Sequence, residues 1–580
     1  MFLYCHFNAM INRFYKKSFC ILFFFAFACV PKKNADLVIT GGKIYTVNSK
    51  DSVVEAVAVI DDRIVFVGSS VDAQEFINEK TKVIDLQGKI LTPGFIEGHG
   101  HIMGVGYNEI ELDLAQVRSY DEMIQKVKEA VSKSSPGNWI VGRGWHQDKW
   151  DTKPDVMVKG FPIHKQLSEI SPDNPVFLRH ASGHAGFANE KAMEMAGVNQ
   201  LSKEKFKSEE GQGGEVVRDA LGNPTGLFNE RAMDLIDEHI PANSQERDAE
   251  ALDLAIKACL RNGITSFQDA GATRESIDLF HRFKSGGRLG VRLYVMISGR
   301  DSDQVYEWLK KGPEIDSLGL LTIRSIKLNC DGALGSRGAW LLSPYTDRPD
   351  FSGMATLSMD TVMKISRLAL KHGFQVCSHA IGDRANREIL DRYETAFKED
   401  PDRSTNARFR IEHAQHLHPQ DILRFASLGV LPAMQAIHMS SDRPWAIERL
   451  GGERIKQGAY VWQSLLKSGA KIVNGTDAPV EPLNPIPCFY AAVTRKTLEG
   501  QPAGGFEPEQ KMTRMQALRS YTIDAAFGAF EESRKGSIEP GKLADFTIFS
   551  QDLMTFPEDQ ILKTEVSMTI VGGKVSYQKP

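Results

Sequence analysis

Between residues 90 and 474, apolar segments with the character of β-strands alternate with amphipathic segments of helical periodicity. In 360–371 and 385–398, apolar residues recur every three to four positions, which is the period of a helix with one buried face. Repeated strand–helix units predict a parallel sheet, and eight units predict an α/β fold of the (β/α)8 TIM-barrel type. The predicted strands are 90–96, 263–268, 291–297, 323–328, 374–378, 409–412, 430–435 and 471–474.

Two parts of the chain lie outside this repeat. The gap between the strand ending at residue 96 and the strand beginning at residue 263 is too long for one crossover, so we expect a large insertion after strand 1. Residues 36–47 have the pattern of a strand pair around Gly41-Gly42, and 541–549 and 566–575 are again β-like, which predicts a small β-sandwich built from both chain ends. The predicted domains are a leader at 1–29, a composite β-sandwich at 35–90 and 533–580, and a barrel at 91–532 with the insertion at about 105–255.

The composition is that of a soluble globular protein and gives no sign of a nucleic-acid partner. The 580 residues are 42% apolar and 25% charged, as in an ordinary soluble globular protein, and the formal net charge is -4. With no basic excess, nothing favours a nucleic-acid partner. A homo-oligomer is compatible with the sequence. No Cys pair has metal-site spacing, so we expect four cysteines to be buried free thiols: Cys259, Cys330, Cys377 and Cys488.

The first 29 residues have the organisation of an export signal. Three basic residues within 13–17 precede the apolar segment 19–28, which is too short to span a bilayer comfortably. Small residues then precede Cys29, and this resembles the processing site of a bacterial lipoprotein. We expect an exported protein, anchored by lipid at Cys29 in the outer membrane or periplasm if the host is Gram-negative. The alternative is a plain secretory signal cut after Ala28, and translation can begin at Met1 or Met10.

Potential metal ligands follow several predicted strands. His99 and His101 are two residues apart at a strand end, so their imidazoles share one face, as two ligands of one metal ion would. A single His at a strand end is more often a structural residue. A Lys inside an apolar strand is rarer, because burying its charge is costly. The other candidates at later strand ends are Lys327, His379, His413 and Asp477.

These motifs together resemble the amidohydrolase superfamily, in the type 3 branch that includes N-substituted formamide deformylases. The resemblance extends from about residue 35 to residue 577. Glu97 stands where Asp is common, and Thr476 stands where Ser is common; neither change removes a ligand. The segments that carry the resemblance are 93–101, 183–185, 224–226, 331–337, 379–383, 412–415, 475–479 and 541–545.

The resemblance implies a hydrolase that cleaves a carbon–nitrogen bond of a small-molecule amide, N-acyl or N-formyl, through a metal-activated hydroxide. It implies two divalent ions, Zn or else Fe, Mn or Ni, with Lys327 carboxylated and bridging them. Asp477 is then also the catalytic proton carrier. The implied ligands are His99, His101 and Asp477 for one ion, and His379 and His413 for the other.

Five further residues are candidates for substrate binding. Trp145, His146 and His184 lie in the insertion, from which they can reach over the barrel mouth. The alternative is that Trp145 packs the insertion core and that His184 bonds locally. Asp331 and Arg337 follow the fourth predicted strand, where they can contact substrate or support a metal ligand.

Two other functions remain open at this point. Mononuclear deaminases of nucleobase-like rings share this fold and most of its ligands, but they typically have a Glu as proton shuttle soon after the fifth-strand His. Here Ala-Ile-Gly-Asp follows His379, and Lys327 is present, which favours two metal ions. A non-catalytic surface lipoprotein is the third possibility, and the complete ligand set speaks against it.

The lipid anchor leads to the first prediction. In cells, Cys29→Ser should move the protein from the membrane fraction to the soluble exported fraction, because no later segment supplies a second anchor in the sequence. Fractionation with immunoblotting measures this, and Cys259→Ser is the matched control. Membrane association that is unchanged by Cys29→Ser would refute lipidation at this position.

Overall fold

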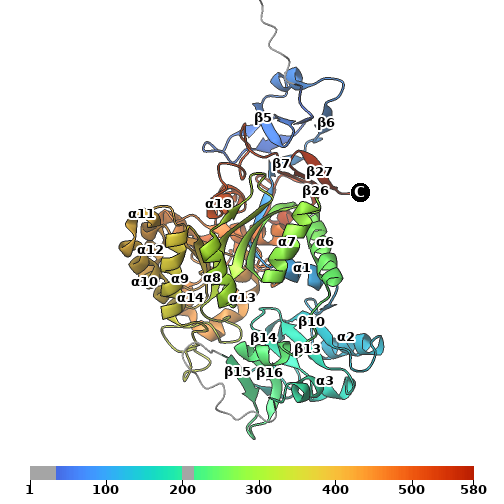
Figure 1. The fold of residues 1–580 in the computed structure, drawn as a ribbon, viewed down its shortest axis with the longest axis vertical. Coiled ribbons are helices and arrows are strands. Elements are labelled where there is room, and N and C mark those ends of the chain that lie inside the picture. Colours follow the sequence, from blue (N-terminus) through green and yellow to red (C-terminus); the bar gives the residue numbers. More distant parts are fainter. Residues whose placement is uncertain (1–33, 199–213) are drawn as a thin grey trace, which may run out of the picture.

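Eight parallel strands form the centre of the molecule (Figure 1). The computed structural model describes residues 34–198 and 214–580, so the predicted leader and Cys29 lie outside the described residues. The strands follow one another around the sheet in chain order, and every neighbouring pair is parallel. They are β8 (Phe95–Gly100), β17 (Ile264–Ala272), β18 (Arg292–Ser298), β20 (Leu321–Asn329), β21 (Gln375–Ala380), β22 (Arg410–His413), β23 (Leu431–Met434) and β24 (Val473–Asn474). The predicted TIM barrel is confirmed.

The barrel strands are buried on both faces, as parallel strands covered by helices must be. Every residue of β8, β21 and β22 is buried. The outer layer includes α9 (Met359–His372) and α10 (Asp383–Glu399), which cover 360–371 and 385–398 as predicted. Ser358 caps α9 by accepting a hydrogen bond from the backbone of Thr361, and Gly373, in the left-handed conformation at φ 78°, ends it.

Backbone hydrogen bonds join the first and last strands at the barrel mouth. The amide of Asp477, just beyond β24, donates to the carbonyl of His99 over 2.8 Å. The amide of His101 donates to the carbonyl of Ala478 over 2.7 Å. These two bonds place the segments that carry the predicted metal ligands side by side.

Both chain ends build the β-sandwich. One sheet has the order β5-β4-β1-β6, and the other has the order β27-β26-β25-β7-β2-β3. Their facing residues form one core, in which Ile39 and Val57 from the N-terminal end pack with Phe546 and Ile570 from the C-terminal end. The strands are β1 (Leu37–Thr40), β2 (Lys43–Tyr45), β3 (Val53–Val54), β4 (Ala56–Ile60), β5 (Arg63–Gly68), β6 (Lys82–Asp85), β7 (Ile90–Pro93), β25 (Phe546–Phe549), β26 (Val566–Val571) and β27 (Lys574–Gln578).

Two details of the sequence prediction were wrong. The segment 36–47 is not a paired hairpin, because β1 pairs with β4 and β6 in one sheet while β2 pairs with β3 and β7 in the other. The segment 90–96 is not one strand: β7 belongs to the sandwich, and β8 begins the barrel after Gly94. Gly94 touches the side chain of Thr265, and a Cβ atom there would collide with it.

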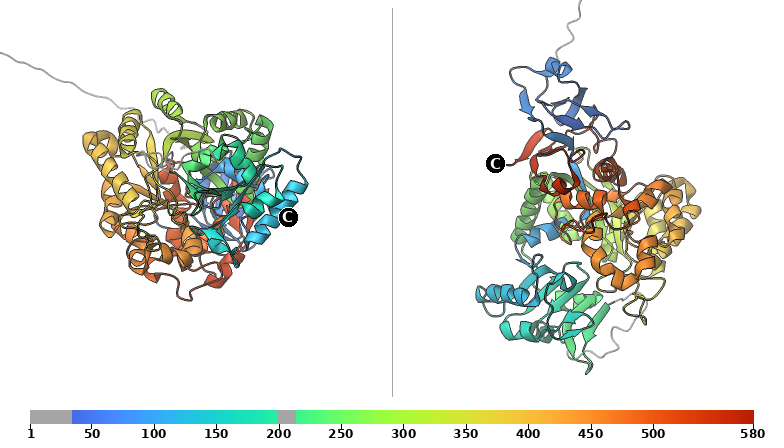
Figure 2. Two further views of the ribbon diagram at one scale, coloured as in Figure 1. Left: turned by 90° about the horizontal axis from the view of Figure 1, so that it is seen from below. Right: turned by 180° about the vertical axis from the view of Figure 1, so that it is seen from behind.

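The insertion has its own six-stranded sheet, in the order β15-β16-β14-β13-β10-β9. Figures 1 and 2 show it at the opposite end of the barrel from the sandwich. Its core includes Trp145, Phe187 and Val127, the last from α2 (Tyr120–Ser132). Its strands are β9 (Leu112–Asp113), β10 (Ile140–Trp145), β13 (Val176–His180), β14 (Ala185–Ala188), β15 (Gly214–Arg218) and β16 (Pro224–Glu230).

Two further features of the described residues bear on the sequence predictions. The four cysteines Cys259, Cys330, Cys377 and Cys488 are free and buried, as expected. Within 34–198 and 214–580, no helix combines the length and the apolar character needed to cross a bilayer.

A buried ion pair connects the barrel to the sandwich. The guanidinium of Arg292, at the start of β18, donates to both carboxylate oxygens of Asp545 over 2.7 and 2.9 Å. Asp545 also accepts a hydrogen bond from the amide of Gly572. Burial alone would raise the pKa of Asp545, but the Arg292 guanidinium holds it below its ordinary value.

We predict that Asp545→Asn lowers the free energy of unfolding by about 3–5 kcal/mol, because it leaves a buried guanidinium without its counter-charge. Urea unfolding measures this. The exposed Asp350→Asn is the control and should change stability by less than about 1 kcal/mol. The loss in free energy of unfolding caused by Asp545→Asn should be largest above about pH 4, where the carboxyl of the unfolded chain is ionised. It should shrink as the pH falls through the lower pKa that Asp545 has in the folded protein. A difference below 1 kcal/mol at pH 7 would contradict this role for the pair.

Candidate active site

The barrel mouth brings the predicted metal ligands together. His99, His413 and Asp477 are buried, and one ligand atom from each lies within 4.8 Å of the others. Oδ1 of Asp477 lies 3.6 Å from Nε2 of His99 and 3.2 Å from Nε2 of His101. Two imidazoles and a carboxylate at this spacing fit a divalent transition metal ion, whose preferred ligands they are.

The remaining two predicted ligands adjoin this cluster. Nζ of Lys327, near the end of β20, lies 3.3 Å from Nε2 of His99. The ring of His379, on β21, lies 4.5 Å from the ring of His413, measured between centroids. All six residues predicted as ligands therefore occupy one end of the barrel.

Polar partners behind the imidazoles fix their orientation. Glu412 binds Nδ1 of His99, and Arg410 binds both oxygens of that carboxylate over 2.7 and 2.8 Å. Oε1 of Gln435 lies 2.7 Å from Nδ1 of His413. A partner on the far ring nitrogen is how proteins commonly aim a metal-binding histidine.

Burial changes the protonation of these groups. Burial lowers the pKa of the Lys327 ammonium, although Glu412 and Asp477 oppose this effect. Burial also lowers the pKa of His99 to about 4, which keeps its imidazole neutral and available as a ligand. For Asp477, burial alone would raise the pKa, but the hydrogen bond from His101 and the nearby imidazoles hold it well below its usual range.

Glu97 supports the loop that carries Asp477. Its carboxyl accepts hydrogen bonds from the amide of Thr476 over 2.5 Å and from the Thr476 hydroxyl over 3.0 Å. Burial raises the pKa of Glu97 to about 8, despite these bonds. Asp477 itself has φ 60°, a left-handed backbone that Asp adopts more readily than most residues other than Gly, so the loop turns sharply at this carboxylate.

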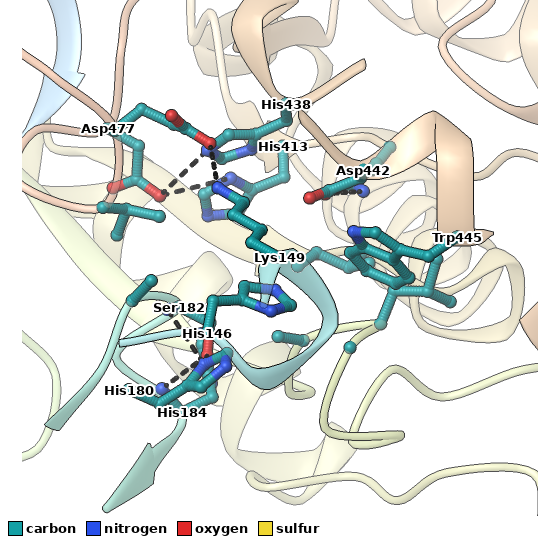
Figure 3. Close-up of a pocket in the computed structure, with 18 of the residues that line it drawn as sticks. His146, Lys149, His180, Ser182, His184, His413, His438, Asp442, Trp445 and Asp477 are labelled. Atoms are coloured by element: carbon teal, nitrogen blue, oxygen red, sulfur yellow. Dashed lines mark hydrogen bonds and ion pairs between the residues drawn. The ribbon is translucent and has the colours of Figure 1, made fainter. Parts of the chain in front are cut away.

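A pocket of about 550 Å³, open solvent at its mouth included, begins at this cluster (Figure 3). His379, His413 and Asp477 line it from the barrel, and His146 and His184 line it from the insertion. The insertion thus forms one wall of the site, and two of the five predicted substrate-binding residues face the pocket.

The other three lie elsewhere. Trp145 is fully buried in the insertion core, where its indole Nε1 donates to the carbonyl of Leu178 over 2.9 Å. Asp331 is buried beneath His379, with Oδ1 3.3 Å from Nε2 of that ring, and accepts hydrogen bonds from backbone amides. Arg337 forms an ion pair with Asp347.

Several pocket residues were not predicted from the sequence. His438, Asp442 and Trp445 lie on α13 (Ala436–Leu450), which follows the seventh barrel strand. Their spacing of four and three residues places them on one face of the helix, and this face lines the pocket from the metal ligands outward. That periodicity was visible in the sequence, but the internal Pro444 obscured the helix. Lys149 from the insertion and Glu481 also line the pocket, where they form an ion pair over 3.4 Å.

Comparison with known proteins places this geometry in a family. Residues 82–577 match the amidohydrolase family. The chain belongs to the amidohydrolase family. It is 34% identical to Protein LONG AFTER FAR-RED 3 of Arabidopsis thaliana, over 94% of this chain and 92% of that one, and 27% identical to the N-substituted formamide deformylase of Arthrobacter pascens, over 94% and 98%. A crystal structure of an uncharacterized metal-dependent hydrolase from Pyrococcus horikoshii superposes with a TM-score of 0.71 at 26% identity, covering 90% of this chain and 99% of that one.

This amidohydrolase is accordingly a metal-dependent hydrolase that acts on carbon–nitrogen bonds. Its candidate metal site is the cluster of His99, His413 and Asp477 at the strand ends. The catalytic face of a TIM barrel is the carboxyl end of its strands, and the cluster lies there.

We predict that Glu412→Gln weakens metal binding about 10- to 100-fold, because His99 loses the charged partner that orients its ring. Competition against a chromophoric chelator measures the affinity. Glu399→Gln, on the exposed surface of α10 beside Arg367, is the control and should leave the affinity unchanged. Equal affinities in Glu412→Gln and wild type would show that this carboxylate has no part in shaping the metal site.

Proposed function

We propose that this amidohydrolase cleaves the amide bond of N-formyl or N-acyl small molecules at a centre of two divalent metal ions. The observation that carries the proposal is the gathering of His99, His413 and Asp477, with Lys327 beside them, where His413 and Asp477 line the pocket. The similarity to a deformylase of N-substituted formamides along nearly the whole chain supports this substrate class.

The donor set is suited to two ions. His99, His101 and Asp477 would hold one, and His379 and His413 would hold the other, with Zn as the first candidate and Fe, Mn or Ni as the alternatives. Bound ions supply Lewis-acid chemistry, because they lower the pKa of water and polarise a carbonyl group.

The lysine between these two groups of ligands needs a further modification to join them. Burial favours the neutral amine of Lys327, and a neutral amine can add its nitrogen to carbon dioxide and release one proton to water, which forms a carbamate. The product is an anion that could bridge two cations. We therefore propose that Lys327 is carboxylated in the active enzyme.

Side chains of the protein would transfer the proton and enclose the substrate. Oδ1 of Asp477 faces His99 and His101, whereas Oδ2 lies 4.0 Å from Nε2 of the pocket residue His438. We assign to Oδ2 the proton that leaves the attacking water and passes to the departing nitrogen. The insertion and α13 form the walls of the pocket, so a small molecule bound at the metal ligands would be enclosed on both sides.

A substrate panel tests this function. Zinc-loaded protein is incubated with N-formyl amines, N-acetyl amines and N-acyl amino acids, and release of the free amine is recorded. Release that requires metal supports the proposal. Ammonia release from aminopurines or aminopyrimidines, with no amide cleavage, would instead establish the deaminase alternative. Absence of any metal from protein purified without chelators would favour a non-catalytic role.

Location is a separate proposal that rests on the sequence alone. We propose that the enzyme works outside the cytoplasm, held to a bacterial membrane through lipid on Cys29. Its substrates would then be amides that reach the cell surface or periplasm.

For the two-ion centre, we predict that Lys327→Ala loses about one metal ion per chain and most of its activity, because the bridging group is gone. Elemental analysis and amine release measure the two effects, and short carboxylic acids should restore part of the activity. Lys471→Ala, at an exposed lysine near the opposite end of the barrel strands, is the control. A single ion per chain in fully active wild type would rule out the two-ion form.

A further inference from the structure

His184 comes from the insertion, yet its ring lies against the metal-binding end of the barrel. It occupies the turn between β13 and β14 and lines the pocket. Its ring centroid lies 5.0 Å from that of His379, and Figure 3 shows it on the insertion side, across the pocket from His413 and Asp477. A substrate held between the two walls would meet this ring next to its reacting group.

His184 has the same kind of support as the predicted metal ligands. Nδ1 of its ring is hydrogen-bonded to Oε2 of Glu230 over 2.8 Å, just as Nδ1 of His99 is bonded to Glu412. Two other pocket histidines are supported differently: His180 is bonded to Ser182 and Gln147, and His146 accepts a hydrogen bond from the amide of Asp148. Glu230 therefore directs the opposite ring nitrogen, Nε2, away from itself.

The position of Glu230 is energetically costly. It is 6% exposed, and it has φ 52°, which is strained for a residue with a side chain. Its carboxylate enters the loop after β20, where Gly332 and Gly338 leave room for it, since a Cβ atom at either position would collide with Oε1. The amide of Glu230 also donates to the carbonyl of His184 over 2.9 Å, so the two residues form one fixed unit.

We propose that His184 is a catalytic residue whose Nε2 hydrogen-bonds the scissile amide group, and that Glu230 is the positioning residue that holds the imidazole in place. The inference rests on the proposed amide hydrolysis. It gives the insertion a part in the chemistry, because one side of the reacting group is then held by the barrel and the other by the insertion. This role explains why a buried, strained carboxylate lies behind an imidazole at the pocket wall.

The kinetic test compares H184Q, E230Q and E230D with the control H239Q, which makes the same His-to-Gln change at an exposed position of the insertion. H184Q should lower kcat about 100-fold, the size expected for loss of one hydrogen bond to the reacting group, with the metal content unchanged. E230Q should lower kcat about 10-fold, and E230D should recover part of that loss. The double variant should be no slower than H184Q alone, because Glu230 acts through His184.

A second measurement does not depend on turnover. Acetate, which presents the carboxylate left by amide hydrolysis, is titrated by calorimetry into the metal-loaded proteins. H184Q should bind acetate several-fold more weakly than wild type, and H239Q should match wild type. If acetate binding depends on His184 but no amide is cleaved, the proposed function fails and the contact stands.

Three results would overturn the inference. One is a kcat and an acetate affinity in H184Q that both equal those of wild type. Another is loss of metal in H184Q, which would make His184 a ligand instead. The third is a double variant whose kcat loss is the product of the two single losses, because Glu230 would then act independently of His184.

Discussion

The fully buried hydrogen-bonded chain from Arg410 through Glu412 to the neutral imidazole of His99 is the interaction on which the site depends. Arg410 also donates to the carbonyl of Gly98 over 2.8 Å and to Gln268, so its guanidinium is bonded to β8 and β17 from its place on β22. Removing ions from water inside a protein costs several kcal/mol each unless every charge is paired and hydrogen-bonded. The three strands must therefore assemble around this chain together, and once they do, the His99 imidazole has a single orientation.

The active site is composite because the barrel alone leaves it open. The strand ends provide the metal ligands, while the insertion and α13 provide the walls of the pocket. The sandwich contributes at the other end of the barrel, where the Arg292–Asp545 pair anchors the base of β18. The metal ligands thus lie at the end of the barrel opposite the sandwich, and residues of the insertion that face the substrate can vary without disturbing the ligand-bearing strands.

The fold could be predicted because the barrel strands are short apolar runs between helical segments, and five of them end at a chemically distinctive residue. Lys327, His379 and His413 were identified by that position, and they lie together in the structure. The strand predictions that were wrong depended on pairing between residues far apart in the sequence. The split between β7 and β8 is set by Gly94 lying against Thr265, which is 171 positions away by residue number and invisible in the local pattern.

Side chains near a motif were harder to place than the motif itself. Trp145 and His146 are neighbours, yet one packs the insertion core and the other lines the pocket, because successive positions at the end of β10 point in different directions. Glu230 follows a recognised motif but carried no signal of its own, since its partner His184 is distant in sequence and its strained backbone appears only in the folded chain.

Anomalous X-ray diffraction from zinc-loaded crystals tests the central claim most directly. We expect anomalous density within bonding distance of His99, His413 and Asp477, with a second peak about 3.5–4 Å away beside Lys327 and His379. Zinc bound at other side chains, with no density among these residues, would contradict it.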